Sequence, residues 1–294
     1  MFLTSTPLGP VIRITYERVL ECRGRAPRRI DFARTRPDQP KRSTDPRWVG
    51  SFSVPFDKTI KPLFKAATGF DFIHKTSVFH GKEMENYFLS IKTEDDFTRI
   101  QNWVAAQGTL VFLRDCLDLS LALDSNFVEV GGPYTTLGEL EHKAKASQDA
   151  DALETLGDLL INAIRDLPFY KDTKMVMAVP AAKEKLFDLP SVLAQRVAFT
   201  LSKEDLTSRF AFHGAKGQVK DCALEEEWLQ LESADLRYTG SNLAGACVIL
   251  IDDKYQSGTT MQYVAMKLQE AGAKRVYGIS LVKTLRDGDN VATK

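Results

Sequence analysis

Short apolar runs alternate with helical stripes along the second half of the chain. Residues 175–179, 248–251 and 276–282 are almost entirely apolar, which predicts strands buried on both faces of a parallel sheet. Between them, apolar side chains recur at the spacing of an α-helix. These helical stretches cover residues 153–167, 189–201 and 261–271. Strands that alternate with helices favour an α/β fold in which helices flank a parallel sheet.

The first half of the chain contains both the alternating apolar pattern of strands and the apolar spacing of helices. Alternating apolar residues predict strands, which cover 11–16, 52–54, 87–91, 109–113 and 117–123. Helical spacing predicts helices at 57–64 and 96–107. A turn at 124–126 leads into apolar residues at 127–130, which predicts a hairpin with the strand before it. This half therefore reads as a mixed α+β region.

Charge and polarity place the boundaries between three predicted parts. Residues 1–50 are rich in Arg and Pro and carry eleven Lys or Arg against five Asp or Glu. We predict a basic, partly disordered arm over 1–50, a mixed α+β domain over 51–145 and an α/β domain over 146–294. The arm is typical of a segment that contacts nucleic acid or a protein partner, and the alternative is a solvated, partly disordered tail.

The composition of the whole chain narrows the class of protein. Its 294 residues carry a formal net charge of zero, which implies no strong global attraction to nucleic acid or to a membrane. The four cysteines lie far apart without a Cys-x-x-Cys pair, which predicts neither a disulfide framework nor a zinc site. We find no signal-peptide pattern and no uninterrupted apolar span. The expectation is a cytoplasmic protein that does not enter the membrane.

The strand predicted at 248–251 leads into candidate chemistry. Asp252 and Asp253 follow it directly, and Ser257 and Gly258 begin a small turn before the next helix. Unpaired N–H groups at a helix N-terminus attract anions, and Gly258 lets an anion approach the main chain closely. Carboxylates before such a turn can accept hydrogen bonds from vicinal sugar hydroxyls, so the pattern is typical of a ribose phosphate site. The alternative is a pair of solvated carboxylates and a serine that only caps the helix.

Two stretches resemble the type I phosphoribosyltransferases. Residues 248–260 resemble the signature that binds phosphoribosyl pyrophosphate (PRPP), and residues 179–183 resemble the pyrophosphate loop of the ComF-like branch. The resemblance implies the Rossmann-like fold of that family. It also implies that Asp252 and Asp253 hold the ribose hydroxyls and a Mg²⁺ ion. The implied phosphate site comprises Gln256, Ser257, Gly258, Thr259 and Thr260, and the implied pyrophosphate site comprises Ala181, Ala182 and Lys183. An ordinary loop lysine is the alternative for Lys183.

The activity that this resemblance implies is that of a glycosyltransferase. A nitrogen nucleophile would displace pyrophosphate from the anomeric carbon of PRPP, with carboxylates and Mg²⁺ stabilising the developing charges. Gln256 stands where purine-salvage members place a carboxylate base, and Lys254 and Tyr255 replace a small apolar pair. The cysteine-rich zinc module of ComF-like proteins is missing. The alternative function is a non-catalytic module that senses PRPP or a nucleotide, or that binds nucleic acid or a partner protein.

Overall fold

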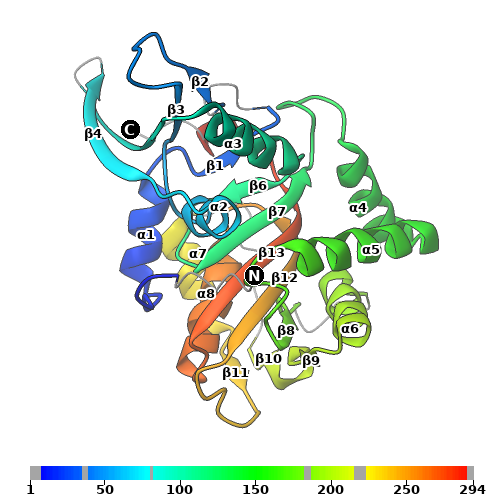
Figure 1. The fold of residues 1–294 in the computed structure, drawn as a ribbon. Coiled ribbons are helices and arrows are strands. Elements are labelled where there is room, and N and C mark those ends of the chain that lie inside the picture. The colour runs from blue at the N-terminus through cyan, green and yellow to red at the C-terminus, as the bar shows by residue number, and fades with distance from the viewer. Residues whose placement is uncertain (1–7, 35–38, 80–81, 182–186, 215–222, 290–294) are drawn as a thin grey trace.

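A seven-stranded sheet forms the centre of the molecule (Figure 1). The computed structural model describes residues 8–34, 39–79, 82–181, 187–214 and 223–289. Five neighbouring strands, from β7 to β9, run parallel, and the other two run antiparallel to their neighbours. In order across the sheet the strands are β1 (Arg29–Asp31), β6 (Val111–Leu113), β7 (Leu119–Ser125), β13 (Arg275–Lys283), β12 (Cys247–Tyr255), β8 (Met175–Ala178) and β9 (Glu204–Asp205).

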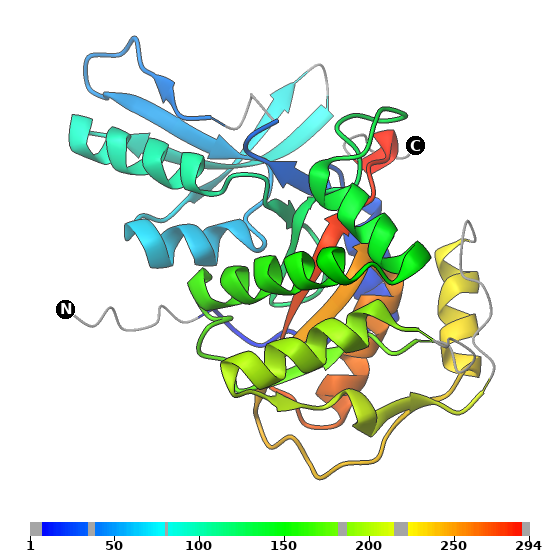
Figure 2. The same cartoon turned by 90° about the vertical axis from the view of Figure 1, so that its right-hand side faces the viewer.

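Helices cover both faces of this sheet, which explains why its central strands contain unbroken apolar runs such as residues 248–251. On β12, Ile249 and Ile251 are buried in one apolar core, and Val248 and Leu250 are buried in the other. The first core is closed by α4 (Thr136–Ser147), α5 (Ala150–Asp166) and α6 (Leu189–Leu201), and the second by α1 (Tyr16–Gly24), α7 (Leu224–Ser233) and α8 (Thr259–Glu270). Figure 2 shows the first group of helices in front of the strands. The predicted α/β fold with a mostly parallel, helix-flanked sheet is confirmed.

A second, antiparallel sheet packs beside the first through an aromatic core. The Phe52 ring lies 5.6 Å from the Phe64 ring, and Phe64 in turn meets Trp103 edge-on at 4.9 Å. Trp103 also contacts Phe112 of β6, so the two sheets share one core. In order, the strands of this sheet are β2 (Lys41–Arg42), β3 (Gly50–Val54), β5 (Lys82–Ile91) and β4 (Ile73–Phe79), and its helices are α2 (Ile60–Thr68) and α3 (Glu94–Ala106).

The remaining elements are short. Strands β10 (Phe210–Phe212) and β11 (Leu236–Tyr238) form a separate antiparallel ribbon. Two turns of 3-10 helix, η2 (Thr207–Arg209) and η3 (Asp287–Asp289), lie after β9 and β13 respectively. Within the described ranges, no helix has both the length and the apolar composition needed to cross a membrane.

Two predictions for the first half are wrong. The strand predicted at 11–16 is an irregular segment that leads into α1. The side chain of Gln269 bonds its main chain, accepting from the Ile14 N–H at 2.8 Å and donating to the Ile12 carbonyl at 3.0 Å. The predicted hairpin is also absent, because β7 is buried on both faces between β6 and β13, and Phe127 makes only an isolated bridge.

The seven-stranded sheet takes strands from each of the three parts predicted from charge and polarity. Strand β1 lies in residues 1–50, β6 and β7 lie in residues 51–145, and the other four strands lie in residues 146–294. Strand β7 pairs in parallel with β13, which joins the second and third parts directly. The carboxyl end of β12 is therefore surrounded by side chains from all three.

Candidate functional site

The predicted acidic pair lies inside a strand rather than after it. β12 continues past its apolar run and ends at Tyr255, so Asp252 and Asp253 are both strand residues. The Asp252 side chain is partly exposed, and its Oδ1 accepts a hydrogen bond from the Asp253 N–H at 2.9 Å. Asp253 is 8% exposed. The two carboxylates therefore have different surroundings.

Asp253 belongs to a network of alternating charges in which the two carboxylates are buried and the two lysines are partly exposed. Its Oδ2 lies 2.8 Å from Nζ of Lys145 on α4, and Lys145 also lies 3.3 Å from Oε1 of the buried Glu141. The other oxygen of Glu141 lies 3.0 Å from Nζ of Lys254. Burial lowers the pKa of Lys145, whereas the nearby carboxylates of Asp253 and Glu141 raise it. The effect of the carboxylates is larger, so the pKa of Lys145 is raised overall. Two carboxylates and two ammonium groups thus neutralise one another.

The network depends on a local break in the alternation of β12. Neighbouring strand residues normally point to opposite faces, yet Asp253 and Lys254 both reach α4. At the same level of β13, Leu281 and Val282 both enter the core on the α4 side. Tyr255 then points to the other face, where it packs in the second core. The residues after the acidic pair are therefore placed by packing on both sides of the sheet.

The hydroxyl-rich turn holds a carboxylate from the protein itself. Glu227 of α7 is 4% exposed, and its Oε2 accepts hydrogen bonds from Ser257 Oγ at 3.3 Å and from Thr259 Oγ1. Arg23 of α1 reaches the same group, with Nη1 3.1 Å from Glu227 Oε2 and 3.3 Å from Thr259 Oγ1. Two side chains predicted to bind a phosphate therefore bind an internal anion, with an arginine beside it.

Gly258 is required by the way Tyr255 folds beneath the turn. Its φ of +77° lies in the left-handed region, and a Cβ there would stand 2.1 Å from the Tyr255 hydroxyl oxygen. That hydroxyl donates to Oδ2 of the buried Asp115 at 2.9 Å, and burial raises the pKa of the Asp115 carboxyl. The turn is therefore fixed from below by a buried hydrogen bond.

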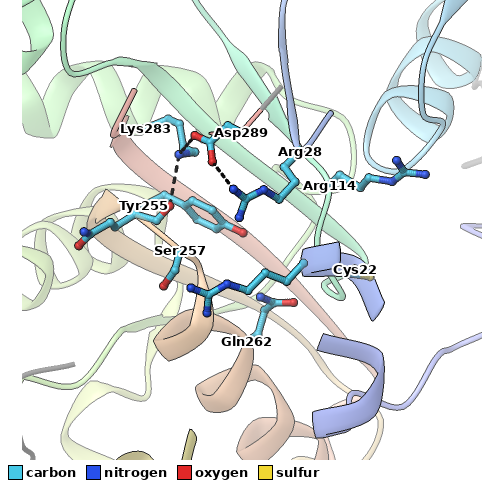
Figure 3. Close-up of a pocket in the computed structure, with 10 residues that line it drawn as sticks. Cys22, Arg28, Arg114, Tyr255, Ser257, Gln262, Lys283 and Asp289 are labelled. Atoms are coloured by element: carbon cyan, nitrogen blue, oxygen red, sulfur yellow. Dashed lines mark hydrogen bonds and ion pairs between the residues drawn. The ribbon is translucent and has the colours of Figure 1, made fainter. Parts of the chain in front are cut away.

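A pocket with an excess of positive charge opens beside the turn (Figure 3). Ser257 and Tyr255 form part of its wall. Four cationic side chains line it against one carboxylate. The cations are Arg23, Arg28, Arg114 and Lys283, and the carboxylate is Asp289. We call this the basic pocket. Glu227 pairs with Arg23 and Glu85 pairs with Arg114 from outside the lining, which leaves an excess of one positive charge that favours an anionic ligand.

Lys283 of the basic pocket contacts two main-chain carbonyls and one carboxylate. Its ammonium group lies 2.6 Å from Asp289 Oδ2 and donates to the carbonyls of Gln256 and Thr284 at 3.2 Å and 2.6 Å. Arg28 holds the other oxygen of Asp289 at 3.0 Å. Burial of Lys283 outweighs the attraction of Asp289 and lowers the lysine's pKa to about 8.

The predicted pyrophosphate loop is described only in part. The Val179 N–H donates to the Ile251 carbonyl at 2.8 Å, so β8 and β12 stay paired to the edge where the acidic pair begins. Ala181 follows two residues later, while Ala182 and Lys183 lie outside the described residues. In the described part of the chain, no group of three or more His, Cys, Asp or Glu side chains is arranged to hold a metal ion.

Several residues around the turn were missed by the sequence analysis. Glu227 lies in residues 202–247, for which the sequence analysis predicts no element, and Lys145 lies at the predicted boundary between residues 51–145 and 146–294. The Arg-rich composition of residues 1–50 was the one signal available, and it indicated either an arm that contacts an outside partner or a solvated tail. Instead, Arg23 and Arg28 contact carboxylates at the carboxyl edge of this chain's own sheet.

No family model matches the chain, and no curated protein matches it either. Solved structures with a partial likeness include adenine phosphoribosyltransferase from Leishmania donovani, at 13% identity and a TM-score of 0.32, covering 52% of this chain and 74% of that one. A purine phosphoribosyltransferase from Pyrococcus horikoshii has 15% identity and a TM-score of 0.29, covering 45% and 82%. The adenine phosphoribosyltransferase from Leishmania tarentolae has 13% identity and a TM-score of 0.34, covering 60% and 96%. Likenesses at this level do not establish a shared activity.

Proposed function

We propose that this chain binds a phosphorylated ribose, PRPP or a related ribose phosphate, at the carboxyl end of β12. The observation that carries the proposal is the anion already held by Ser257 and Thr259, next to a pocket with surplus positive charge. Hydroxyl donors at a helix N-terminus suit a phosphate as well as a carboxylate. An arginine beside them adds a charge-assisted contact that suits either anion.

The ligand's 5-phosphate would replace the carboxylate of Glu227 in the turn. Arg23 would then pair with the phosphate. Asp252, which is partly exposed, would accept a hydrogen bond from a ribose hydroxyl, while Asp253 stays with Lys145. The two carboxylates would therefore have different roles, whereas the resemblance to type I phosphoribosyltransferases implies that both hold ribose hydroxyls.

Transfer at the anomeric carbon is the activity that we propose for such a ligand. Positive charge develops on the ribose as pyrophosphate leaves, and the carboxylate of Asp252 would stabilise it. A Mg²⁺ ion would neutralise the charge of the pyrophosphate leaving group. Proteins usually hold Mg²⁺ through one or two carboxylates together with phosphates of the ligand, so Asp252 and the diphosphate would hold it here. Membership of the ComF-like branch and the identity of the acceptor stay predictions.

A non-catalytic sensor is the second candidate, and a separate observation favours it. Gln256 cannot titrate as a base, and Asp253 is already neutralised by Lys145. A site with these features could bind a ribose phosphate reversibly without activating an acceptor. In that case the ligand would act by moving Glu227 and with it α7.

Calorimetric titration of the full chain with PRPP in magnesium chloride tests the binding. We expect saturable binding that weakens about tenfold in Asp252→Asn, because a charge-assisted hydrogen bond is lost. Asp158→Asn, an exposed carboxylate on α5 paired with Arg196, is the matched control and should bind as the parent does. Equal affinities for the parent and Asp252→Asn would contradict the site.

Pyrophosphate release in the presence of a panel of nitrogen bases separates the two candidates. Release that depends on a base supports transfer. Saturable binding of PRPP without release supports the sensor.

A further inference from the structure

Two thiols that are far apart in sequence touch beside the basic pocket. Cys22 lies in the last turns of α1, and Cys116 lies in the connection between β6 and β7. Their sulfur atoms are 3.4 Å apart, across a sequence separation of 94 residues. Both are free thiols in this structure. We call them the thiol pair.

The two thiols differ in their access to solvent. Cys22 is partly exposed and lines the basic pocket, where Figure 3 labels it. Cys116 is 6% exposed, and its main-chain N–H donates to Oε1 of Gln262 on α8 at 3.0 Å. A small reagent that enters the pocket therefore meets Cys22 first.

They also differ in acidity. The Cys116 thiol donates a hydrogen bond to Cys22 Sγ, which lowers the pKa of Cys22 and raises the pKa of Cys116, and burial raises Cys116 further. Burial and the charges of Asp115 and Glu21 oppose the lowering of the Cys22 pKa, while Lys58 supports it, and the hydrogen bond from Cys116 decides the direction. Because the thiolate is the nucleophile in thiol chemistry, this arrangement suits Cys22 as the attacking sulfur and Cys116 as the resolving one.

We propose that the thiol pair is a redox site that a hydroperoxide converts to a disulfide. The Cys22 thiolate attacks the peroxide, a sulfur–oxygen bond forms, the oxygen–oxygen bond breaks, and the alkoxide leaves with a proton as an alcohol. Cys116 then attacks the Cys22 sulfenic acid, and the hydroxide leaves as water with the Cys116 proton. Two thiols and one peroxide give one disulfide, one alcohol and one water, with two electrons passing from sulfur to oxygen.

The helix can supply the movement that this bond needs. A disulfide bond is about 2.05 Å long, so the sulfur atoms must approach by about 1.4 Å from 3.4 Å. Cys116 is held by the bond to Gln262, and its neighbour Asp115 is held by Tyr255. In contrast, Val19 is the only buried residue of α1. We infer that α1 moves toward the sheet while Cys116 stays in place.

Oxidation would fasten the helix that carries Arg23. Arg23 follows Cys22 directly and contacts both Glu227 and Thr259 in the turn. In the reduced protein, Arg23 is held at the turn by noncovalent contacts alone, with Glu227 and Thr259. In the oxidised protein, the disulfide would keep Arg23 at the turn, so the redox state of the thiol pair would set how firmly α1 is held.

Peptide mass spectrometry of the full chain after treatment with hydrogen peroxide tests the proposal. We expect a cross-linked peptide that joins Cys22 to Cys116, the loss of two thiols per chain, and reversal by dithiothreitol. Hydrogen exchange over residues 16–24 should slow at least tenfold in the oxidised protein. Peroxide that leaves both thiols intact, or that joins either one to another cysteine instead, would overturn the proposal.

Single variants separate the two roles. Cys116→Ser should stop at a Cys22 sulfenic acid that dimedone traps, and Cys22→Ser should lower the rate of peroxide consumption at least tenfold. Cys247→Ser is the matched control, since Cys247 contacts the Tyr277 hydroxyl instead, and it should react like the parent. Trapping of sulfenic acid at Cys116 in the Cys22→Ser variant, at the rate of the parent, would contradict the assigned order.

Discussion

Glu227 shows what single residues contribute at the end of β12. Its carboxylate meets Ser257, Thr259 and Arg23, where the sequence predicts a ligand phosphate. The hydroxyls and Gly258 could be predicted from sequence because an anion bound at a helix N-terminus needs hydrogen-bond donors and close approach to the main chain. Glu227 could not, since it comes from a helix 30 residues earlier whose burial depends on tertiary packing.

Removing the charge of Glu227 should strengthen the binding of a phosphorylated ligand. In Glu227→Gln the incoming phosphate no longer has to displace a carboxylate from Arg23, so we expect the Kd for ribose 5-phosphate to fall about tenfold. Calorimetry measures this. Glu226→Gln, an exposed neighbour on α7, should leave the Kd unchanged. Weaker binding in Glu227→Gln would show that the ligand does not use this position.

Lys283 should give the protein a distinctive dependence on pH. Its pKa falls from 10.5 to about 8 on folding, so between these values the unfolded chain binds more protons than the folded protein. Its titration therefore adds stability as pH rises above about 8. From pH 7 to 9.5 we expect the unfolding free energy of the parent to gain about 2 kcal/mol relative to Lys283→Arg, which stays charged.

Urea unfolding of both proteins at the two pH values measures that difference. Lys274→Arg, at an exposed position, should follow the parent. A Lys283→Arg variant with the same pH dependence as the parent would mean that Lys283 keeps its proton in the folded state.

Among whole elements, β12 and α8 show how well the spacing of apolar residues in the sequence predicts strands and helices. The apolar run at 248–251 and the helical stripe at 261–271 predicted both elements, yet the predicted strand ends four residues early. Charged residues such as Asp253 and Lys254 read as a loop. They stay in the strand because Lys145 and Glu141 of α4 neutralise them. Such compensation from a distant helix leaves no mark in the local pattern.

Gly258→Ala should weaken the junction between these elements. The substitution combines a left-handed backbone with a Cβ 2.1 Å from the Tyr255 hydroxyl oxygen, and we expect it to cost about 3 kcal/mol of stability. Gly245→Ala isolates the backbone contribution, because Gly245 has φ +81° with nothing within 4 Å of its added Cβ. It should cost about 1 kcal/mol. Equal losses in urea unfolding would argue against the contact with Tyr255.

For the whole molecule, the class of fold followed from sequence more readily than its connections. Local periodicity identified strands buried on both faces, and these require helices on each side. The pairing of β7 with β13 joins residues more than 150 positions apart, and no local pattern specifies which strand lies next to which. The shared aromatic core around Phe112 is likewise a long-range feature.

Because β7 pairs with β13, we expect the seven-stranded sheet to fold only when all of its strands are present. A fragment of residues 146–294 lacks β7 and would expose the paired edge of β13, where Ile279 and Leu281 are fully buried. We expect the fragment to show no cooperative thermal transition by circular dichroism, in contrast to the full chain. A cooperative transition would show that β8, β9, β12 and β13 with their helices form a stable unit alone.

The turn at Ser257 and Thr259 already binds the carboxylate of Glu227, so it is ordered without a bound ligand. The Glu227 carboxylate is tethered and always present, so it competes at a high effective concentration with every dissolved anion. Singly charged solutes of the same size gain nothing by displacing it. At the proposed site, a dissolved anion would therefore displace Glu227 only if it carries a second negative charge or makes further contacts, such as those of a sugar.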